Sequence, residues 1–115
     1  MSKALKTALI KQTGEVSIRT FTSFKQMQQA VGGFIQAFAF GEKATAFVNE
    51  DGIAMKLLPN AMATVLCKHF DVGVAIDDHI KGNMIVIGNA DAEGNETNIP
   101  DPILEEILRV AKEIE

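Results

Sequence analysis

The chain has 115 residues, 47% of them apolar, and its fifteen acidic and eleven basic residues give a formal charge of -4. This length predicts a single domain, residues 1–115, whose hydrophobic core is large enough to fold without a metal or a disulfide. The mildly acidic balance argues against a protein that binds the nucleic-acid backbone, because such proteins normally carry a basic face.

Cysteine content and hydropathy indicate the compartment. Cys67 is the only cysteine, so an intrachain disulfide is excluded, which is usual in a reducing environment. No stretch approaches the roughly 20 apolar residues of a membrane helix, and the N-terminus has no apolar run of signal-peptide length. We therefore expect a cytoplasmic protein without membrane association.

The first part of the chain predicts a strand hairpin followed by a helix. Residues 4–10 and 16–21 are predicted strands, the second with the alternating pattern of a half-buried strand. Ser23, with Gln26 three residues later, fits a capping box at the start of a helix. Gly32-Gly33 ends this helix, because glycine adopts the left-handed conformation at little cost.

Three further strands are predicted in the middle of the chain. Residues 34–40 are apolar on both faces except at Gln36, which predicts a central strand or one covered on both sides. Residues 44–48 form the next apolar strand. Asn49–Gly52 is a hairpin-type turn, and residues 53–57 return from it as a strand.

Two helices and one strand complete the predicted fold. Asn60 is a good N-cap, and apolar residues at helical spacing predict a helix as far as residue 70. Residues 84–87 form an apolar, largely β-branched run typical of a buried strand, and residues 101–114 carry the apolar stripe of a final helix. The order β-β-α-β-β-β-α-β-α predicts an α+β fold in which three helices pack on a mostly antiparallel sheet.

Four motifs follow one another in the middle of the chain. They are Val31–Gln36, Val48–Gly52, Leu58–Asn60 with Ala63–Thr64, and Asp78–Gly82 with Ile85–Gly88. In order and spacing they resemble the family known as domain of unknown function 3846, over roughly residues 24–88. The resemblance implies a small protein of bacteria, phages and other mobile elements, and it supplies no reaction. Ala61 and Met62 stand where members of this family often place basic residues.

Two segments of the chain are candidate ligand sites. Asn49, Glu50 and Asp51 place two carboxylates and an amide on one turn, which suits a cation or a polar ligand, and the alternative is a solvated hairpin turn. Asn60 and Thr64 lie one helical turn apart at a helix start, where free N–H groups can hold a phosphate. The alternative there, which we favour, is N-capping by Asn60 with Thr64 packed beside it.

The remaining polar and thiol groups give weaker candidates. Asp77, Asp78 and His79 form a cluster suited to acid–base or metal chemistry, and a solvated turn is the alternative. Cys67 and His69 lie two residues apart and so face different sides of a helix, which does not make a zinc site. We predict no catalytic residue, no bound metal and no cofactor.

Together these patterns predict a non-enzymatic binding protein of a phage or mobile element. It would sequester a nucleotide-like small molecule or mask a host protein, and we predict a homo-oligomer, most simply a dimer. The alternative is a small enzyme with a carboxylate site at residues 49–51 and 77–79.

The predicted site joins the turn at Asn49–Asp51 to the helix start at Asn60 and Thr64, with Asp78 as a third contributor. A strand at residues 53–57 would hold the turn and the helix start about 17 Å apart. We therefore expect the site at a subunit interface.

Overall fold

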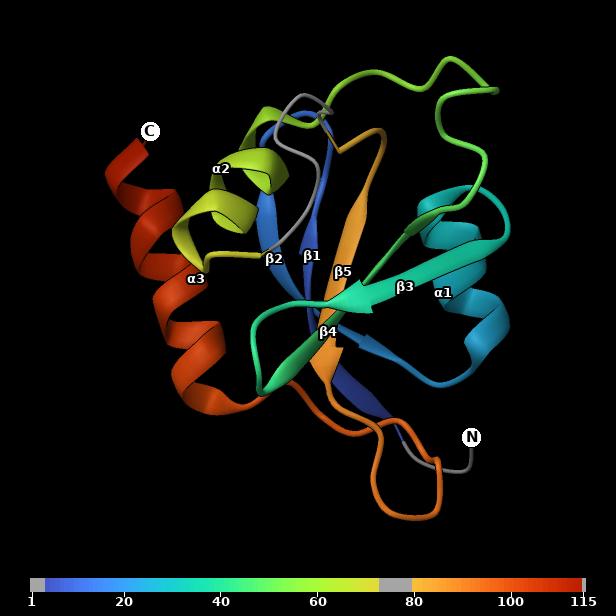
Figure 1. The fold of residues 1–115 in the computed structure, drawn as a ribbon, viewed down its shortest axis with the longest axis vertical. Helices are drawn as coiled ribbons and strands as arrows, with labels where there is room; N and C mark the ends of the chain where they lie inside the picture. Colours follow the sequence, from blue (N-terminus) through green and yellow to red (C-terminus); the bar gives the residue numbers. More distant parts are fainter. Residues whose placement is uncertain (1–3, 73–79, 115) are drawn as a thin grey trace.

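Five strands and three helices form the described part of the computed structural model, residues 4–72 and 80–114 (Figure 1). In chain order they are β1 (Leu5–Ile10), β2 (Val16–Phe21), α1 (Phe24–Val31), β3 (Ile35–Ala39), β4 (Ala44–Asn49), α2 (Ala61–His69), β5 (Met84–Gly88) and α3 (Asp101–Ile114). None of the helices in these ranges is long and apolar enough to cross a membrane.

The strands form one sheet in the order β2-β1-β5-β4-β3, and every neighbouring pair is antiparallel. The predicted α+β class, with three helices on an antiparallel sheet, is confirmed. β5 comes from the last third of the chain and inserts between β1 and β4 (Figure 1). Within the sheet of the described residues, the hairpins β1–β2 and β3–β4 are therefore hydrogen-bonded to each other only through β5.

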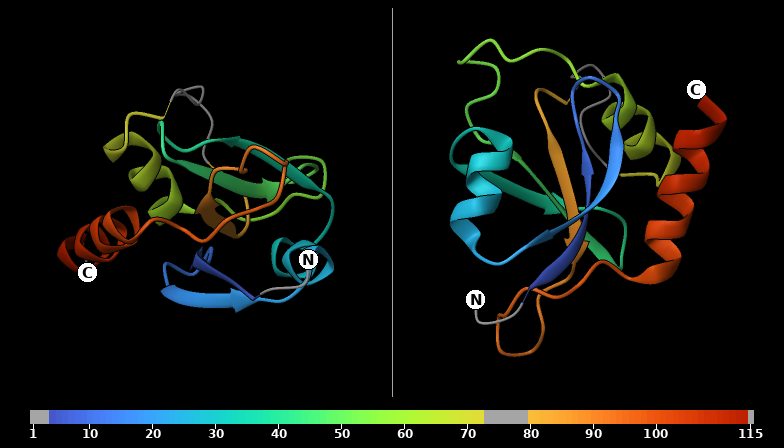
Figure 2. Two further views of the ribbon diagram at one scale, coloured as in Figure 1. Left: turned by 90° about the horizontal axis from the view of Figure 1, so that it is seen from below. Right: turned by 180° about the vertical axis from the view of Figure 1, so that it is seen from behind.

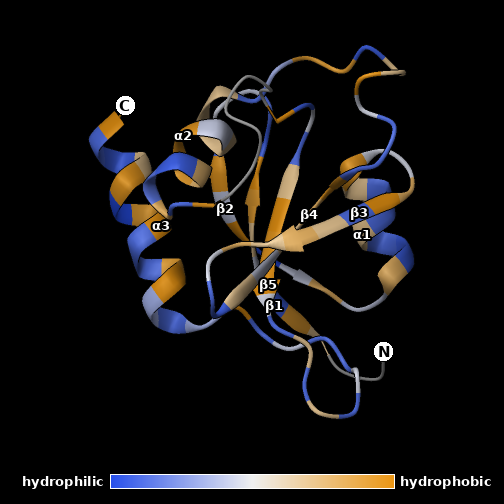
Figure 3. Ribbon diagram, in the orientation of Figure 1, coloured by the Kyte–Doolittle hydropathy of each residue, from blue (hydrophilic) through white to orange (hydrophobic). Residues whose placement is uncertain are grey.

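Helices cover both faces of the sheet (Figure 2). Side chains of β4 and β5 alternate between the two layers, as the pleat requires. Phe47 and Ile85 pack in the cluster that contains Met27 of α1, whereas Ala46 and Val86 pack in the larger cluster beneath α2 and α3. The apolar stripes of the helices turn toward the sheet in Figure 3, and their polar residues face outward.

The strand predicted at residues 53–57 is wrong. Residues 50–56 form consecutive turns, and the N–H of Leu57 donates to the carbonyl of Gly52 at 2.9 Å. Lys56 has a positive φ of 56°, which no strand allows. The physical reason is that β4 already pairs with β3 on one side and β5 on the other, so no edge of β4 is left for a returning strand.

The central position predicted for residues 34–40 is also wrong. This segment forms β3, which lies at the edge of the sheet and pairs with β4 alone among the described residues. Phe38 and Ile35 pack against the two core clusters, but Gln36, Ala37 and Ala39 are exposed. The apolar pattern therefore marks an uncovered edge rather than a central strand.

Both predicted helix starts are confirmed. The Ser23 hydroxyl accepts from the N–H of Gln26 at 3.1 Å and caps α1. The Asn60 side chain accepts from the N–H of Ala63 at 2.9 Å and caps α2. Asn60 does more than cap, because its fully buried Nδ2 also donates to the carbonyls of Ile10 and Gly82 at 3.0 and 2.8 Å.

Replacing Asn60 by Ala should therefore cost more stability than an ordinary cap deletion. The variant loses the cap and two further buried hydrogen bonds, which together should cost about 2–4 kcal/mol. Ser23→Ala removes a cap at the surface and should cost about 1 kcal/mol. Urea denaturation of both variants measures the difference, and equal losses would contradict the assigned role of Asn60.

Candidate functional site

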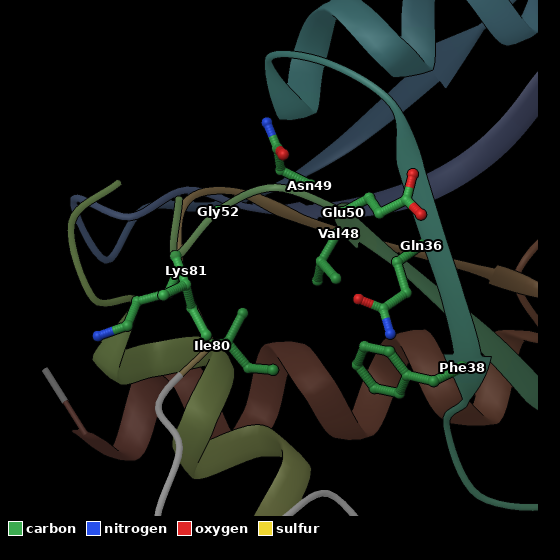
Figure 4. A pocket seen from close by; sticks show the side chains of 9 residues that line it. Gln36, Phe38, Val48, Asn49, Glu50, Gly52, Ile80 and Lys81 are labelled. Atoms are coloured by element: carbon green, nitrogen blue, oxygen red, sulfur yellow. The ribbon is translucent and has the colours of Figure 1, made fainter. Parts of the chain in front are cut away.

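A pocket of about 160 Å³ opens between β3, the turn that follows β4 and residues 80–81 (Figure 4). We call it the β3 pocket. It is lined by Gln36, Phe38, Val48, Asn49, Glu50, Gly52, Ile53, Ile80 and Lys81. The β3–β4 hairpin and a segment from much later in the chain thus meet at one edge of the sheet.

The interior of the β3 pocket is mainly apolar. The side chains of Phe38, Val48 and Ile80 face one another across it, and the carboxamide of Gln36 points inward beside the Phe38 ring (Figure 4). Glu50 lies at the rim with an exposed carboxylate. A flat apolar group with a hydrogen-bonding edge matches these walls, since its faces would meet side-chain carbon and its edge the Gln36 amide.

Gly52 determines how closely the turn approaches residues 80–81. A Cβ atom at Gly52 would lie 3.0 Å from the Cβ of Lys81, so a larger residue would push the two segments apart. The stem of Lys81 forms part of the wall, and its ammonium group extends away from the pocket in Figure 4. The pocket therefore owes its width to a glycine rather than to a charged contact.

Asn49 lines the pocket with its backbone side, and its side chain points away from the pocket and supports the turn. Its Nδ2 donates to the carbonyl of Val31 at 3.1 Å, and its Oδ1 accepts from the N–H of Asp51 at 2.7 Å. The side chain is buried and points toward α1 in Figure 4. Of the three candidates on this turn, Asn49 and Glu50 line the pocket, whereas Asp51 is exposed and does not line it.

Asn60 and Thr64 lie behind the pocket wall. The Thr64 hydroxyl donates to the carbonyl of Asn60 at 2.9 Å and accepts from the N–H of Ile80 at 3.1 Å. The N–H of Asn60 donates to the carbonyl of Ile80 at 2.7 Å. The Thr64 hydroxyl and the Asn60 backbone N–H thus fix Ile80, whose side chain reaches the pocket. Direct ligand contact by Asn60 or Thr64 stays a prediction.

The distance argument for a site shared between subunits is wrong. It required an extended strand at residues 53–57, but Leu57 folds back to hydrogen-bond Gly52. Residue 81 lies beside Gly52 and also forms a β-bridge with Pro59. One chain therefore brings the turn and the helix start to the same segment. The third predicted contributor, Asp78, lies outside the described residues, as do Asp77 and His79.

Seven pocket residues were not predicted as site residues from the sequence: Gln36, Phe38, Val48, Gly52, Ile53, Ile80 and Lys81. Val48, Gly52 and Ile53 flank the predicted turn. Gln36 carried a signal, because it is the single polar side chain in an otherwise apolar strand. Phe38, Ile80 and Lys81 carried none, because their position depends on contacts between distant segments.

Cys67 and His69 take part in separate structural contacts. Burial raises the pKa of the Cys67 thiol to about 11. His69 Nε2 lies 2.8 Å from Glu106 of α3, and Arg109 pairs with the same carboxylate at 2.7 Å. Within residues 4–72 and 80–114 no three His, Cys, Asp or Glu side chains gather as metal ligands would.

A second, wider hollow of about 530 Å³ lies between the β1–β2 hairpin and α1. Several of its polar groups already have partners within the protein. Gln26 accepts from Thr22, and Asn83 donates to the carbonyl of Ala30. The guanidinium of Arg19 lies 5.4 Å from the centre of the Phe21 ring. The lining of this hollow is more polar than that of the β3 pocket, so it offers a flat apolar group less contact with side-chain carbon.

The fold and the pocket define a class: a small α+β domain with one antiparallel sheet, helices on both faces and a pocket at the sheet edge. The family model described as "Domain of unknown function (DUF3846)" matches residues 5–112. The chain belongs to this family, as its motifs predicted. Comparisons with curated proteins and with solved structures found no significant match.

The buried thiol of Cys67 should react slowly. At pH 8 the native protein should consume a thiol reagent far more slowly than the same protein in urea, because burial disfavours the thiolate. Cys67→Ala should leave ligand binding unchanged, since the side chain lies outside the β3 pocket. A native thiol as reactive as the unfolded one would contradict this assignment.

The ion pairs of Glu106 should make stability depend on pH in acid. Hydrogen bonds from Arg109 and then His69 lower the pKa of Glu106 to about 2. Because the folded pKa lies below the unfolded one, this contribution is present above about pH 4.5 and is lost as the pH falls toward 2. The melting temperature of Glu106→Gln should therefore fall less steeply in this window than that of the parent.

Glu105→Gln is the matched control, because Glu105 is the exposed neighbour on the same helix. Its melting temperature should follow the parent curve. If Glu106→Gln and Glu105→Gln behaved alike, the link between α2 and α3 through Glu106 would carry no stability.

Proposed function

We propose that this protein is a non-enzymatic binding protein that sequesters a nucleotide-like small molecule in the β3 pocket. The observation that carries the proposal is the pairing of an apolar interior with one inward amide, that of Gln36 (Figure 4). A nucleobase has two apolar faces and a hydrogen-bonding edge, and side-chain amides pair with such edges. Phe38 supplies a ring on which a base can stack.

The groups at the rim suit the rest of such a ligand. The Glu50 carboxylate can accept hydrogen bonds from sugar hydroxyls, and the flexible Lys81 side chain can swing an ammonium group toward a phosphate. We further propose that this small protein belongs to a phage or other mobile element and acts by sequestration. Masking of a host protein is the other form of the proposal, and a homo-oligomer, most simply a dimer, belongs to both.

Binding is tested first by a thermal-shift screen of nucleotides and signalling dinucleotides, with native mass spectrometry to count the bound molecules. We expect at least one of these compounds to raise the melting temperature and to bind one molecule per chain. If none binds, the small-molecule proposal fails.

The site is tested with the compound that binds best in this screen. Gln36→Ala should weaken its affinity about tenfold, because one amide hydrogen bond of about 1–1.5 kcal/mol is lost. Gln29→Ala is the matched control, because it removes the same exposed amide from the other hollow and should bind as the parent does. Titration calorimetry measures both variants. If Gln36→Ala binds as tightly as the parent, the ligand lies elsewhere.

A further inference from the structure

Within residues 4–72 and 80–114, the backbone groups on the outer edge of β3 have no partner strand. The carbonyl of Phe34 accepts from Glu50 and the N–H of Phe40 donates to Ala44, so the even-numbered residues direct their N–H and C=O groups toward β4. Alternation along a strand then turns those of Ile35, Ala37 and Ala39 outward. Among the described residues no strand pairs with this edge (Figure 2).

Nothing in the composition of β3 protects this edge. Residues 34–40 contain no charged side chain and no proline, which are the usual devices that keep edge strands from pairing. Ala37 and Ala39 are small as well as exposed, so another backbone can approach closely. Phe34, at the start of the segment, is 68% exposed.

We propose that β3 pairs antiparallel with β3 of a second copy, about a two-fold axis at Ala37. In this register Ala37 faces Ala37 of the partner subunit and Ile35 faces Ala39 of the partner subunit. Every outward N–H and C=O of the three residues then has a partner, and no like charges face each other. A shift by two residues leaves one of the three residues on each strand unpaired.

The other edge of the sheet is a poorer surface for self-pairing. Just before β2 the carbonyl of Glu15 accepts from Lys11, so Val16, Ile18 and Thr20 turn outward by the same alternation. Pairing about Ile18 would make the two Arg19 side chains diagonal neighbours across the axis. Like charges at that spacing repel, which leaves β3 as the edge that favours a second copy.

The pairing also brings partner side chains to the β3 pocket. Gln36 and Phe38 pack on the face of the sheet that carries the pocket, and in this register Gln36 faces Phe38 of the partner subunit. Each pocket thereby gains a second aromatic wall. This consequence rests on the proposed function of the pocket, whereas the strand pairing does not.

The register is tested without any ligand, by oxidation of single-cysteine variants. Ala37→Cys places two thiols at the axis, where Cα atoms about 5.5 Å apart allow a disulfide. Ala39→Cys is the matched control, because its two copies would lie about 13 Å apart along the strands. The native thiol of Cys67 is buried and does not interfere. We expect a covalent dimer from Ala37→Cys alone.

The assembly itself is tested by native mass spectrometry and light scattering at tens of micromolar protein. The parent should have twice the chain mass of 12.4 kDa. Ala37→Lys should be monomeric, because the two ammonium groups would repel each other at the two-fold axis. Its circular dichroism spectrum should be unchanged, because residue 37 is exposed in the single chain. Ile18→Lys, on the other edge, should stay dimeric.

Two results would overturn the pairing. The first is that the parent is monomeric and Ala37→Cys does not cross-link. The edge of β3 would then be expected to pair with a strand from a different protein. A dimer that survives Ala37→Lys would place the interface elsewhere. Neither result bears on the ligand screen, so failure of the pairing is separable from failure of nucleotide binding.

Discussion

The carboxamide of Asn60 is the contact on which the pocket end of the molecule depends. It joins the end of β1, the segment before β5 and the first turn of α2, through bonds to Ile10, Gly82 and Ala63. Its side chain is 0% exposed, so water cannot replace any of these bonds. An N-cap usually contacts only its own helix, but this side chain also holds β1 and the segment before β5 against the start of α2.

The position of the pocket wall follows from that contact. With Gly82 held by Asn60, residues 80–82 lie against the turns that follow β4. Glycines permit the crossing: a Cβ at Gly82 would lie 2.8 Å from Leu57 Cδ1, and Gly82 also has a φ of 76°. Gly52 makes the equivalent close approach to Lys81. Ile80 can therefore face Val48 and Phe38 although more than thirty residues separate it from them.

Patterns within a few neighbouring residues predicted most helices and strands correctly. The prediction failed where segments far apart in the sequence compete to pair with the same strand. Ser23 and Asn60 act within a few residues of themselves, so their caps could be recognised in the sequence. The strands that pair with β4 could not be recognised in this way. β5, at residues 84–88, occupies the edge of β4 with which a strand at residues 53–57 would have paired. For the same reason the apolar run of β3 gave no sign of its edge position. Of the pocket residues outside the predicted turn, Gln36 alone stood out from its neighbours in the sequence.

Layering restricts where this domain can meet a ligand or another chain. α1 closes one face of the sheet and α2 with α3 closes the other, so the core clusters on both faces are already covered. Among the described residues, the β3 edge of the sheet and the turns beside it are left as a contact surface. There the side chains of Phe34, Ile53 and Leu58 are each more than half exposed. Apolar groups gathered outside a closed core mark contact surfaces. The pocket and the open strand edge lie side by side because β3 supplies one wall of the first and all of the second.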